Sequence, residues 1–273
     1  MNFLRKLFGN DNMTAEEAER ERQAKEFDVL KYDGVAALHQ NALPYAVKCL
    51  THALEIKDDA ETRDYLAQAL IRSNNMEAAY EQLSRLASLE PDNVRIWLRM
   101  ADVAYMMENY DAMTDACEKA IGIDSENAIA NYSYARAYIG KDRCADAIGY
   151  LTKAISVSED NPFWEACLLR GQTYLKMGNI EQASKDADNM LQQLGDNEDA
   201  LLLKARCVTA EDDKTAAMSY YGRVIDANPF CAEAYEKRAT LREMTGDNTG
   251  AQADRAALAE LVAHNRPDEN KQE

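Results

Sequence analysis

The sequence predicts an all-α fold built from stacked helical hairpins, and three observations predict it. Of the 273 residues, 47% are hydrophobic, while only 5 are Pro and 11 are Gly, a composition that disfavours both disorder and a turn-rich β protein. Small residues recur about every 34 residues through most of the chain. Between these recurrences lie two runs with the hydrophobic spacing of amphipathic helices, so each period predicts one helix pair.

Three columns of a 34-residue frame, with Trp97 at position 4, carry the repeat. Successive units are offset by 33, 34, 34, 36, 34 and 34 residues. Position 8 is always Gly or Ala, position 20 is Ala with one exception, and position 27 is always apolar. The position 8 residues are Gly34, Ala67, Ala101, Ala135, Gly171, Ala205 and Ala239, and the position 20 residues are Ala46, Ala79, Met113, Ala147, Ala183, Ala217 and Ala251. Small side chains at both positions allow two antiparallel helices to approach closely.

Turn signals separate the two predicted helices of each unit at position 15. That column reads Asn41, Asn74, Glu108, Asp142, Gly178, Asp212 and Gly246, and six of the seven are residues that favour turns or helix ends. Pro91 and Pro229 fall just past a second helix, and Pro44 falls in a first turn, where proline is tolerated. We therefore expect no proline inside a helix.

These columns resemble the motif of the tetratricopeptide repeat family. Its first half is matched by Trp97, Met100 and Ala101 and by Gly171 and Tyr174; its second half is matched by Ala79, Leu83 and Pro91 and by Ala217, Tyr221 and Pro229. The resemblance covers residues 27–264 and implies a right-handed α-solenoid of seven degenerate hairpins. The predicted units are 27–60, 60–93, 94–127, 128–161, 164–197, 198–231 and 232–264.

Outside the repeats we expect a flexible N-terminus, an extension helix and a polar tail. Residues 14–26 begin with Thr14 and Glu17 in capping-box spacing and should continue into the first repeat as one helix. Residues 1–13 contain Phe3, Leu4, Leu7 and Phe8 on one helical face. Two interpretations remain, a frayed end of the chain or a weak peripheral contact with a membrane through these side chains. Residues 265–273 should be disordered.

Charge and composition exclude several functions. The net charge of −17 disfavours nucleic-acid binding, because phosphate recognition needs clustered Lys and Arg. No apolar run is long enough to span a membrane. Six cysteines without C-x-x-C spacing and three scattered histidines predict free thiols, a cytoplasmic location and no metal. No nucleotide, nucleophile or metalloprotease motif occurs, so we expect neither an enzyme nor a cofactor.

The resemblance implies a concave groove lined by first-helix positions, where a peptide of another protein would bind. Arg95 occupies the first turn of its predicted helix, where the helix dipole favours acids instead, and Arg99 lies one turn further on the same face. Two guanidinium groups suit a carboxylate. The candidate peptide-binding residues are Lys31, Tyr65, Arg72, Arg95, Arg99, Tyr105, Tyr132 and Arg136.

Part of this set resembles the carboxylate clamp of chaperone-binding repeat proteins. Lys31, Arg95 and Arg99 match its basic positions, whereas Val35 and Tyr65 stand where the clamp has asparagines. The arginines could instead pair with Asp64 and Asp102 of neighbouring helices. The expected function is a non-enzymatic scaffold or adaptor that binds a peptide through an acidic side chain or C-terminal carboxylate. The alternatives are a self-assembling scaffold and, opposed by the charge, an RNA reader.

Overall fold

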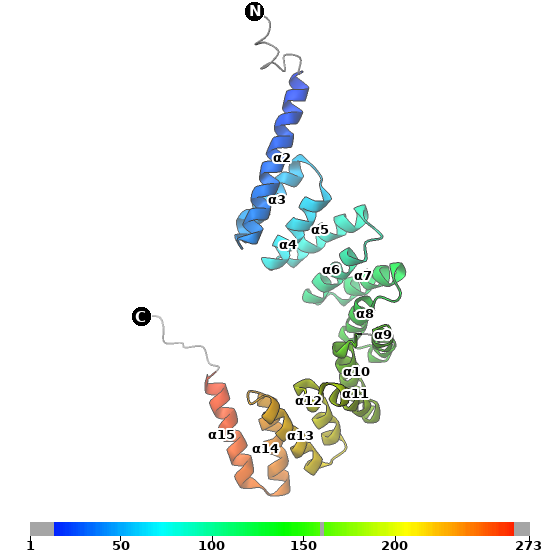
Figure 1. Ribbon diagram of the computed structural model, residues 1–273, viewed down its shortest axis with the longest axis vertical. Coiled ribbons are helices and arrows are strands. Elements are labelled where there is room, and N and C mark those ends of the chain that lie inside the picture. The colour runs from blue at the N-terminus through cyan, green and yellow to red at the C-terminus, as the bar shows by residue number, and fades with distance from the viewer. Residues whose placement is uncertain (1–13, 159–160, 265–273) are drawn as a thin grey trace, which may run out of the picture. The chain divides into compact units, whose positions relative to one another are not determined.

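The computed structural model describes residues 14–158 and 161–264 and shows fourteen α-helices with no strand in these ranges (Figure 1). The prediction of an all-α chain of helical hairpins is confirmed. The peripheral contact proposed for Phe3, Leu4, Leu7 and Phe8, and the tail at 265–273, lie outside the described residues.

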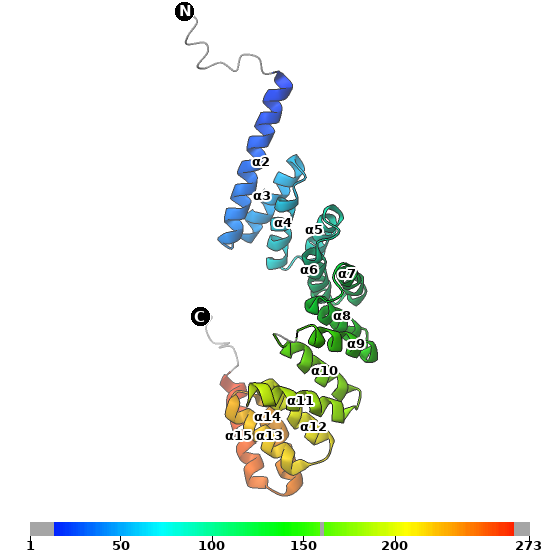
Figure 2. The same ribbon diagram turned by 45° about the vertical axis from the view of Figure 1, so that its right-hand side comes forward.

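The chain divides into two compact units, residues 1–125 and 126–273. The helices of the first unit are α2 (Ala15–His39), α3 (Leu43–Ile56), α4 (Ala60–Arg72), α5 (Met76–Leu89), α6 (Val94–Met106) and α7 (Tyr110–Ile123). Those of the second are α8 (Ala128–Gly140), α9 (Cys144–Ser156), α10 (Trp164–Lys176), α11 (Ile180–Leu194), α12 (Glu198–Ala210), α13 (Lys214–Ala227), α14 (Ala232–Thr245) and α15 (Asn248–His264). Within each unit, helices consecutive in sequence pack side by side (Figures 1 and 2).

The turn inside every hairpin adopts the same backbone conformation. All seven residues of the position 15 column have positive φ, between 54° at Glu108 and 85° at Gly246. Glycine adopts this left-handed region freely and asparagine or aspartate tolerates it, which explains the composition of the column. Glu108 is the exception in chemistry, but its backbone follows the other six.

Side-chain caps fix where many of the helices begin. Thr14 and Glu17 form the predicted capping box at the start of α2. Asn or Asp side chains accept a backbone N–H at the starts of α4, α5, α6, α7, α8, α12 and α13. Each such cap satisfies a donor that the first turn leaves free.

The small-residue columns lie where helices touch. Every residue at positions 8 and 20 is buried, including Met113, the one large side chain among them. A Cβ added to Gly34 would lie 2.6 Å from Cγ of Leu50, and one added to Gly171 would lie 2.5 Å from Cδ2 of Leu203. Leu50 lies in the same hairpin as Gly34, whereas Leu203 lies on α12, in the hairpin that follows Gly171, so the small residues allow close approach both within a hairpin and between neighbouring hairpins.

Two hairpins of the second unit also contain a buried ion pair at equivalent positions. Arg170 donates through Nε and Nη2 to both carboxylate oxygens of Asp186, at 2.9 and 2.6 Å. Arg238 binds Asp254 in the same bidentate way, at 3.0 and 2.6 Å. Both aspartates are at most 5% exposed, so these arginines hold the two helices of their hairpins together.

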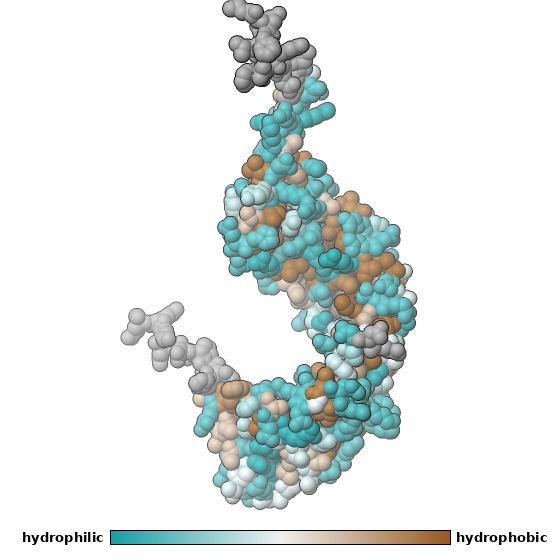
Figure 3. Space-filling model, in the orientation of Figure 1, coloured by the Kyte–Doolittle hydropathy of each residue, from teal (hydrophilic) through white to brown (hydrophobic). Residues whose placement is uncertain are grey.

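The face drawn in Figure 3 is mostly hydrophilic, and hydrophobic residues form scattered patches on it. Among the helices that the structure describes, none has the length and apolar composition needed to cross a bilayer.

Candidate functional site

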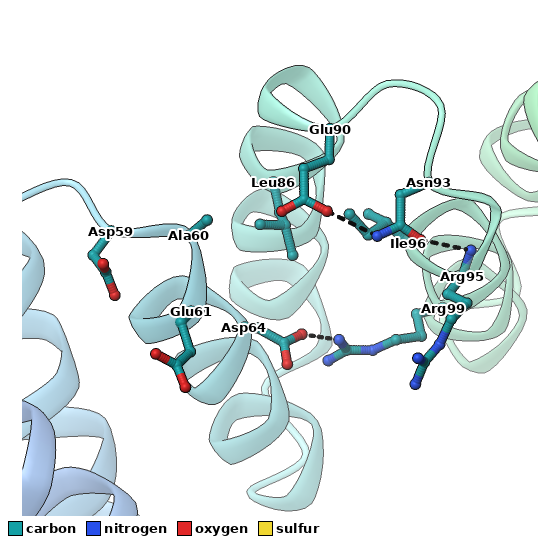
Figure 4. Close-up of a pocket in the computed structure, with 10 residues that line it drawn as sticks. All are labelled: Asp59, Ala60, Glu61, Asp64, Leu86, Glu90, Asn93, Arg95, Ile96 and Arg99. Atoms are coloured by element: carbon teal, nitrogen blue, oxygen red, sulfur yellow. Dashed lines mark hydrogen bonds and ion pairs between the residues drawn. The ribbon is translucent and has the colours of Figure 1, made fainter.

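A pocket of about 530 Å³ opens between α4, α5 and α6 of the first unit (Figure 4). Arg95 and Arg99, the two arginines at the centre of the predicted site, both line it. Its other lining residues are Asp59, Ala60, Glu61, Asp64, Leu86, Glu90, Asn93 and Ile96.

The two arginines extend from α6, and each has hydrogen-bonding capacity left over. Arg99 Nη1 donates to the carboxylate of Asp64 on α4, so one of the pairings weighed from the sequence is present. Its Nη2 is buried and has no partner among the described residues. The exposed side chain of Arg95 likewise makes no hydrogen bond or ion pair to a residue that the structure describes. A buried, unpaired guanidinium donor costs roughly 1–3 kcal/mol, which a bound acceptor would recover.

The pocket wall opposite the arginines contains the acidic residues Asp59 and Glu61, and Lys31 of α2 neutralises part of their charge. Lys31 Nζ donates to Asp59 at 2.9 Å and to Glu61 at 2.6 Å. Partial burial opposes the charge of Lys31, yet the hydrogen bonds to Glu61 and Asp59 raise its pKa. Partial burial also opposes ionisation of Asp59, but hydrogen bonds from Thr62 and Lys31 hold the pKa of Asp59 at about 2. Lys31 therefore supports the pocket wall through its acids.

Two other predicted residues lie on α4 outside the pocket lining. Arg72 donates to the backbone oxygen of Leu38 and to Oδ1 of Asn41, both at 2.8 Å, and so ties the end of α4 to the first hairpin turn. Tyr65 is half-buried, and its hydroxyl lies 3.4 Å from Oε1 of Glu61. Arg72 thus has a structural role, whereas Tyr65 adjoins the acidic wall.

The remaining predicted residues are aromatic or lie in the second unit. Tyr105, on α6, is 39% exposed, and its ring meets the edge of Tyr110 at 6.3 Å. In the second unit, Tyr132 and Arg136 lie on α8; Arg136 stacks over the Tyr132 ring, which also contacts Phe163 at 4.9 Å. These contacts leave the aromatic faces partly covered by neighbouring side chains.

Sequence reasoning missed two features of the pocket. Glu90 lines it from the end of α5 and accepts a hydrogen bond from Asn93, 2.8 Å away. Asp59 lines it from the N-cap of α4. Both residues lie just before the first helix of a repeat, Asp59 before α4 and Glu90 before α6. An acidic residue at an N-cap, or just after a second helix, was therefore the sequence signal that could have located them. The pocket thus has cationic and anionic walls, which suits a ligand that carries a carboxylate beside a donor group.

The described residues contain no group of three or more His, Cys, Asp or Glu placed to hold a metal ion.

Comparisons with known proteins identify the repeat. Two tetratricopeptide repeat models match, one over residues 60–103 and the other over 94–127 and 165–188. DnaJ homolog subfamily C member 3 of Mus musculus is 27% identical over 161 residues, which are 54% of this chain and 32% of the relative; the human protein matches to the same extent. The chain thus spans about a third of the length of these relatives.

Solved structures share the fold. A tetratricopeptide repeat protein from Parabacteroides merdae has a TM-score of 0.68 at 14% identity and covers 90% of this chain and 95% of its own. PilW, a type IV pilus biogenesis factor, has a TM-score of 0.64 at 19% identity and covers 73% of this chain and 91% of its own. YrrB, described as having an unusual peptide-binding site, has a TM-score of 0.53 at 16% identity and covers 68% of this chain and 93% of its own.

The matched models recognise repeats in both units, and the helical hairpins with their small-residue columns have the architecture of those neighbours. Residues 60–127 and 165–188 thus match tetratricopeptide repeats, as the sequence predicted, and the chain shares the fold of proteins built from this repeat.

Proposed function

We propose that this chain is a protein–protein interaction scaffold that captures a peptide carboxylate at Arg95 and Arg99. The tetratricopeptide repeats and the similarity to other repeat proteins support the scaffold role. The observation that carries the site is the buried Nη2 of Arg99, which lies in the same pocket as Arg95; neither this atom nor the Arg95 side chain has a hydrogen-bond partner among the described residues. The ligand is an acidic side chain or a C-terminal carboxylate of another protein.

Asp64 is the internal competitor for this ligand. Its carboxylate already occupies Nη1 of Arg99, so an incoming carboxylate bonds to Nη2 and to Arg95. The acids opposite the arginines favour a ligand whose neighbouring atoms are donors, such as the N–H groups of a peptide backbone. Charge-assisted bonds to two guanidinium groups supply the affinity.

The test compares short acidic peptides that have a free C-terminus with the same peptides amidated, using calorimetry on the full chain. Arg95→Ala combined with Arg99→Ala should weaken binding about 10- to 100-fold, because two charge-assisted contacts are lost. Arg85→Ala is the matched control, since Arg85 is exposed on α5 and pairs only locally with Glu81. Asp64→Asn should strengthen binding by freeing Arg99.

Unchanged affinity in the double variant, for every acidic peptide, would remove the site. An equal loss in the Arg85 control would assign the effect to general charge. The alternative of a self-assembling scaffold stays a prediction, and a monomer at micromolar concentration in sedimentation would speak against it.

We also propose a reducing, cytoplasmic location. All six cysteines are free thiols, and five of them are buried among helices. Thiol labelling of the purified chain under denaturing conditions should therefore modify all six.

A further inference from the structure

A second pocket, separate from the arginine site, lies in the second unit where α9, α10 and α11 meet. It has a volume of about 260 Å³ and is lined by Ile155, Ser158, Pro162, Phe163, Trp164, Cys167, Asn189 and Gln193. None of the described residues in this lining is charged, although 29% of the chain is Asp, Glu, Lys or Arg. Burial raises the pKa of the Cys167 thiol, so this side chain also stays neutral.

Three polar groups of this lining have no hydrogen-bond partner within the part of the chain that the structure describes. They are the side-chain amides of Asn189 and Gln193, one turn apart and exposed on α11, and the indole N–H of Trp164. The chain's other tryptophan does have a partner: the indole N–H of Trp97 donates to the backbone oxygen of Pro91 at 2.8 Å, which fixes the loop between α5 and α6.

The Pro162–Trp164 segment also borders a neighbouring pocket. Ser158, Pro162, Phe163 and Trp164 line both, and the neighbour extends to Ala128, to the acidic Glu165 and to Ile129, whose side chain is 57% exposed. The two adjoining pockets share the aromatic side chains of Phe163 and Trp164, and together they form a groove longer than a single side chain.

We propose that this surface binds an uncharged, extended peptide segment of a partner protein, with one bulky apolar side chain seated against Phe163 and Trp164. Asn189 and Gln193 each offer both donors and an acceptor, which matches the alternating N–H and C=O groups of a peptide main chain. The volume lies below the roughly 300–1,000 Å³ of pockets that enclose whole small molecules, and so fits one side chain. Among the described residues, the lining of this pocket carries no charge and the neighbouring pocket adds the acidic Glu165, so the surface offers no cation to phosphate or to a lipid headgroup.

Because the chain has two tryptophans, Trp97→Phe leaves Trp164 as the single fluorescent reporter. The probes are short acetylated and amidated Gly/Ser peptides with one central Leu, Ile or Phe, and the reference peptide has Ala there. The apolar probes should shift Trp164 emission to shorter wavelength and bind about 10-fold more tightly than the Ala peptide. This affinity should change little with salt, because none of the described residues that line the pocket is charged and the probes are neutral.

Asn189→Ala combined with Gln193→Ala should weaken the Leu probe about 10-fold through lost main-chain hydrogen bonds. Gln192→Ala is the matched control, since Gln192 is exposed on the same helix but does not line the pocket. Arg95→Ala with Arg99→Ala should leave this binding intact.

The proposal is overturned if no probe shifts the emission or binds in calorimetry, or if Gln192→Ala weakens binding as much as the double variant. It is also overturned if the arginine variant abolishes binding, which would place the probe in the first pocket. Self-association that the Asn189 and Gln193 substitutions abolish, seen in sedimentation, would identify the occupant as a second copy instead.

Discussion

At the residue scale, Asp59 joins three parts of the first unit. Its side chain caps α4 through the backbone N–H of Thr62 at 2.9 Å and binds Lys31 of α2 at 2.9 Å. It also lines the arginine pocket. One carboxylate therefore starts a helix, links two hairpins and shapes the proposed binding surface.

This arrangement predicts a specific pH dependence. The pKa of Asp59 is about 2 in the folded chain, below its ordinary 3.8, so ionised Asp59 stabilises the fold above about pH 4. That contribution should be about 1–2 kcal/mol after allowing for solvent screening, fall to about half by pH 3 and vanish below pH 2. Asp59→Asn keeps a capping side chain but loses the charge.

Urea unfolding of the wild type and of Asp59→Asn at pH 6 and pH 3 measures this directly. The stability gap between them should shrink as the pH falls. Glu81→Gln is the control, because Glu81 is an exposed member of a local ion pair. A gap that stays constant from pH 6 to pH 3 would show that the charge of Asp59 contributes nothing.

The candidate site shows how far single residues can be interpreted from sequence. Arg95 and Arg99 could be placed on one face because helical spacing fixes their direction, and the structure brings both to one pocket. The partners of Lys31 and Arg72 lie 28 to 34 residues away, so no local pattern indicates those hydrogen bonds. Long side chains choose partners from tertiary geometry, which a single sequence does not contain.

At the scale of elements, the hairpin turn was the most predictable feature, since its backbone demands positive φ and few residue types accept it. Glu108 is the informative departure, with φ of 54° and no chemical preference for that region. The frame still located this turn because its flanking helices keep the period. Elements are predictable here because period, turn chemistry and small-residue columns agree.

Replacing Glu108 should therefore stabilise the α6–α7 hairpin. Glu108→Gly removes a left-handed strain of roughly 1–2 kcal/mol, less the roughly 0.5–1 kcal/mol of entropy that glycine loses on folding, so a gain of about 0.5–1 kcal/mol is expected in chemical denaturation. Gly178→Ala, at φ of 78° with no atom within 4 Å of the added Cβ, should lose a similar amount through strain alone. If Glu108→Gly is neutral or destabilising, a side-chain contact of Glu108 outweighs the strain.

At the scale of the whole molecule, each helix packs chiefly against the helices adjacent to it in sequence. The stability of each hairpin should therefore depend mainly on its own contacts and on those with the neighbouring hairpins. A local defect should then lower protection locally. Gly34→Ala is a suitable defect, since its Cβ would lie 2.6 Å from Cγ of the fully buried Leu50, and overpacking of this kind costs about 1–3 kcal/mol.

Hydrogen exchange by mass spectrometry should show faster exchange of Gly34→Ala in α2, α3 and α4, and unchanged exchange in α12 to α15. Gly122→Ala is the matched substitution, because nothing lies within 4 Å of its Cβ, and it should slow exchange in α7 slightly through higher helix propensity. Uniformly faster exchange along the whole chain in Gly34→Ala would instead mean that all hairpins unfold as one cooperative body. In that case a ligand at the arginine pocket would stabilise every helix equally, whereas neighbourhood coupling confines its protection to the first unit.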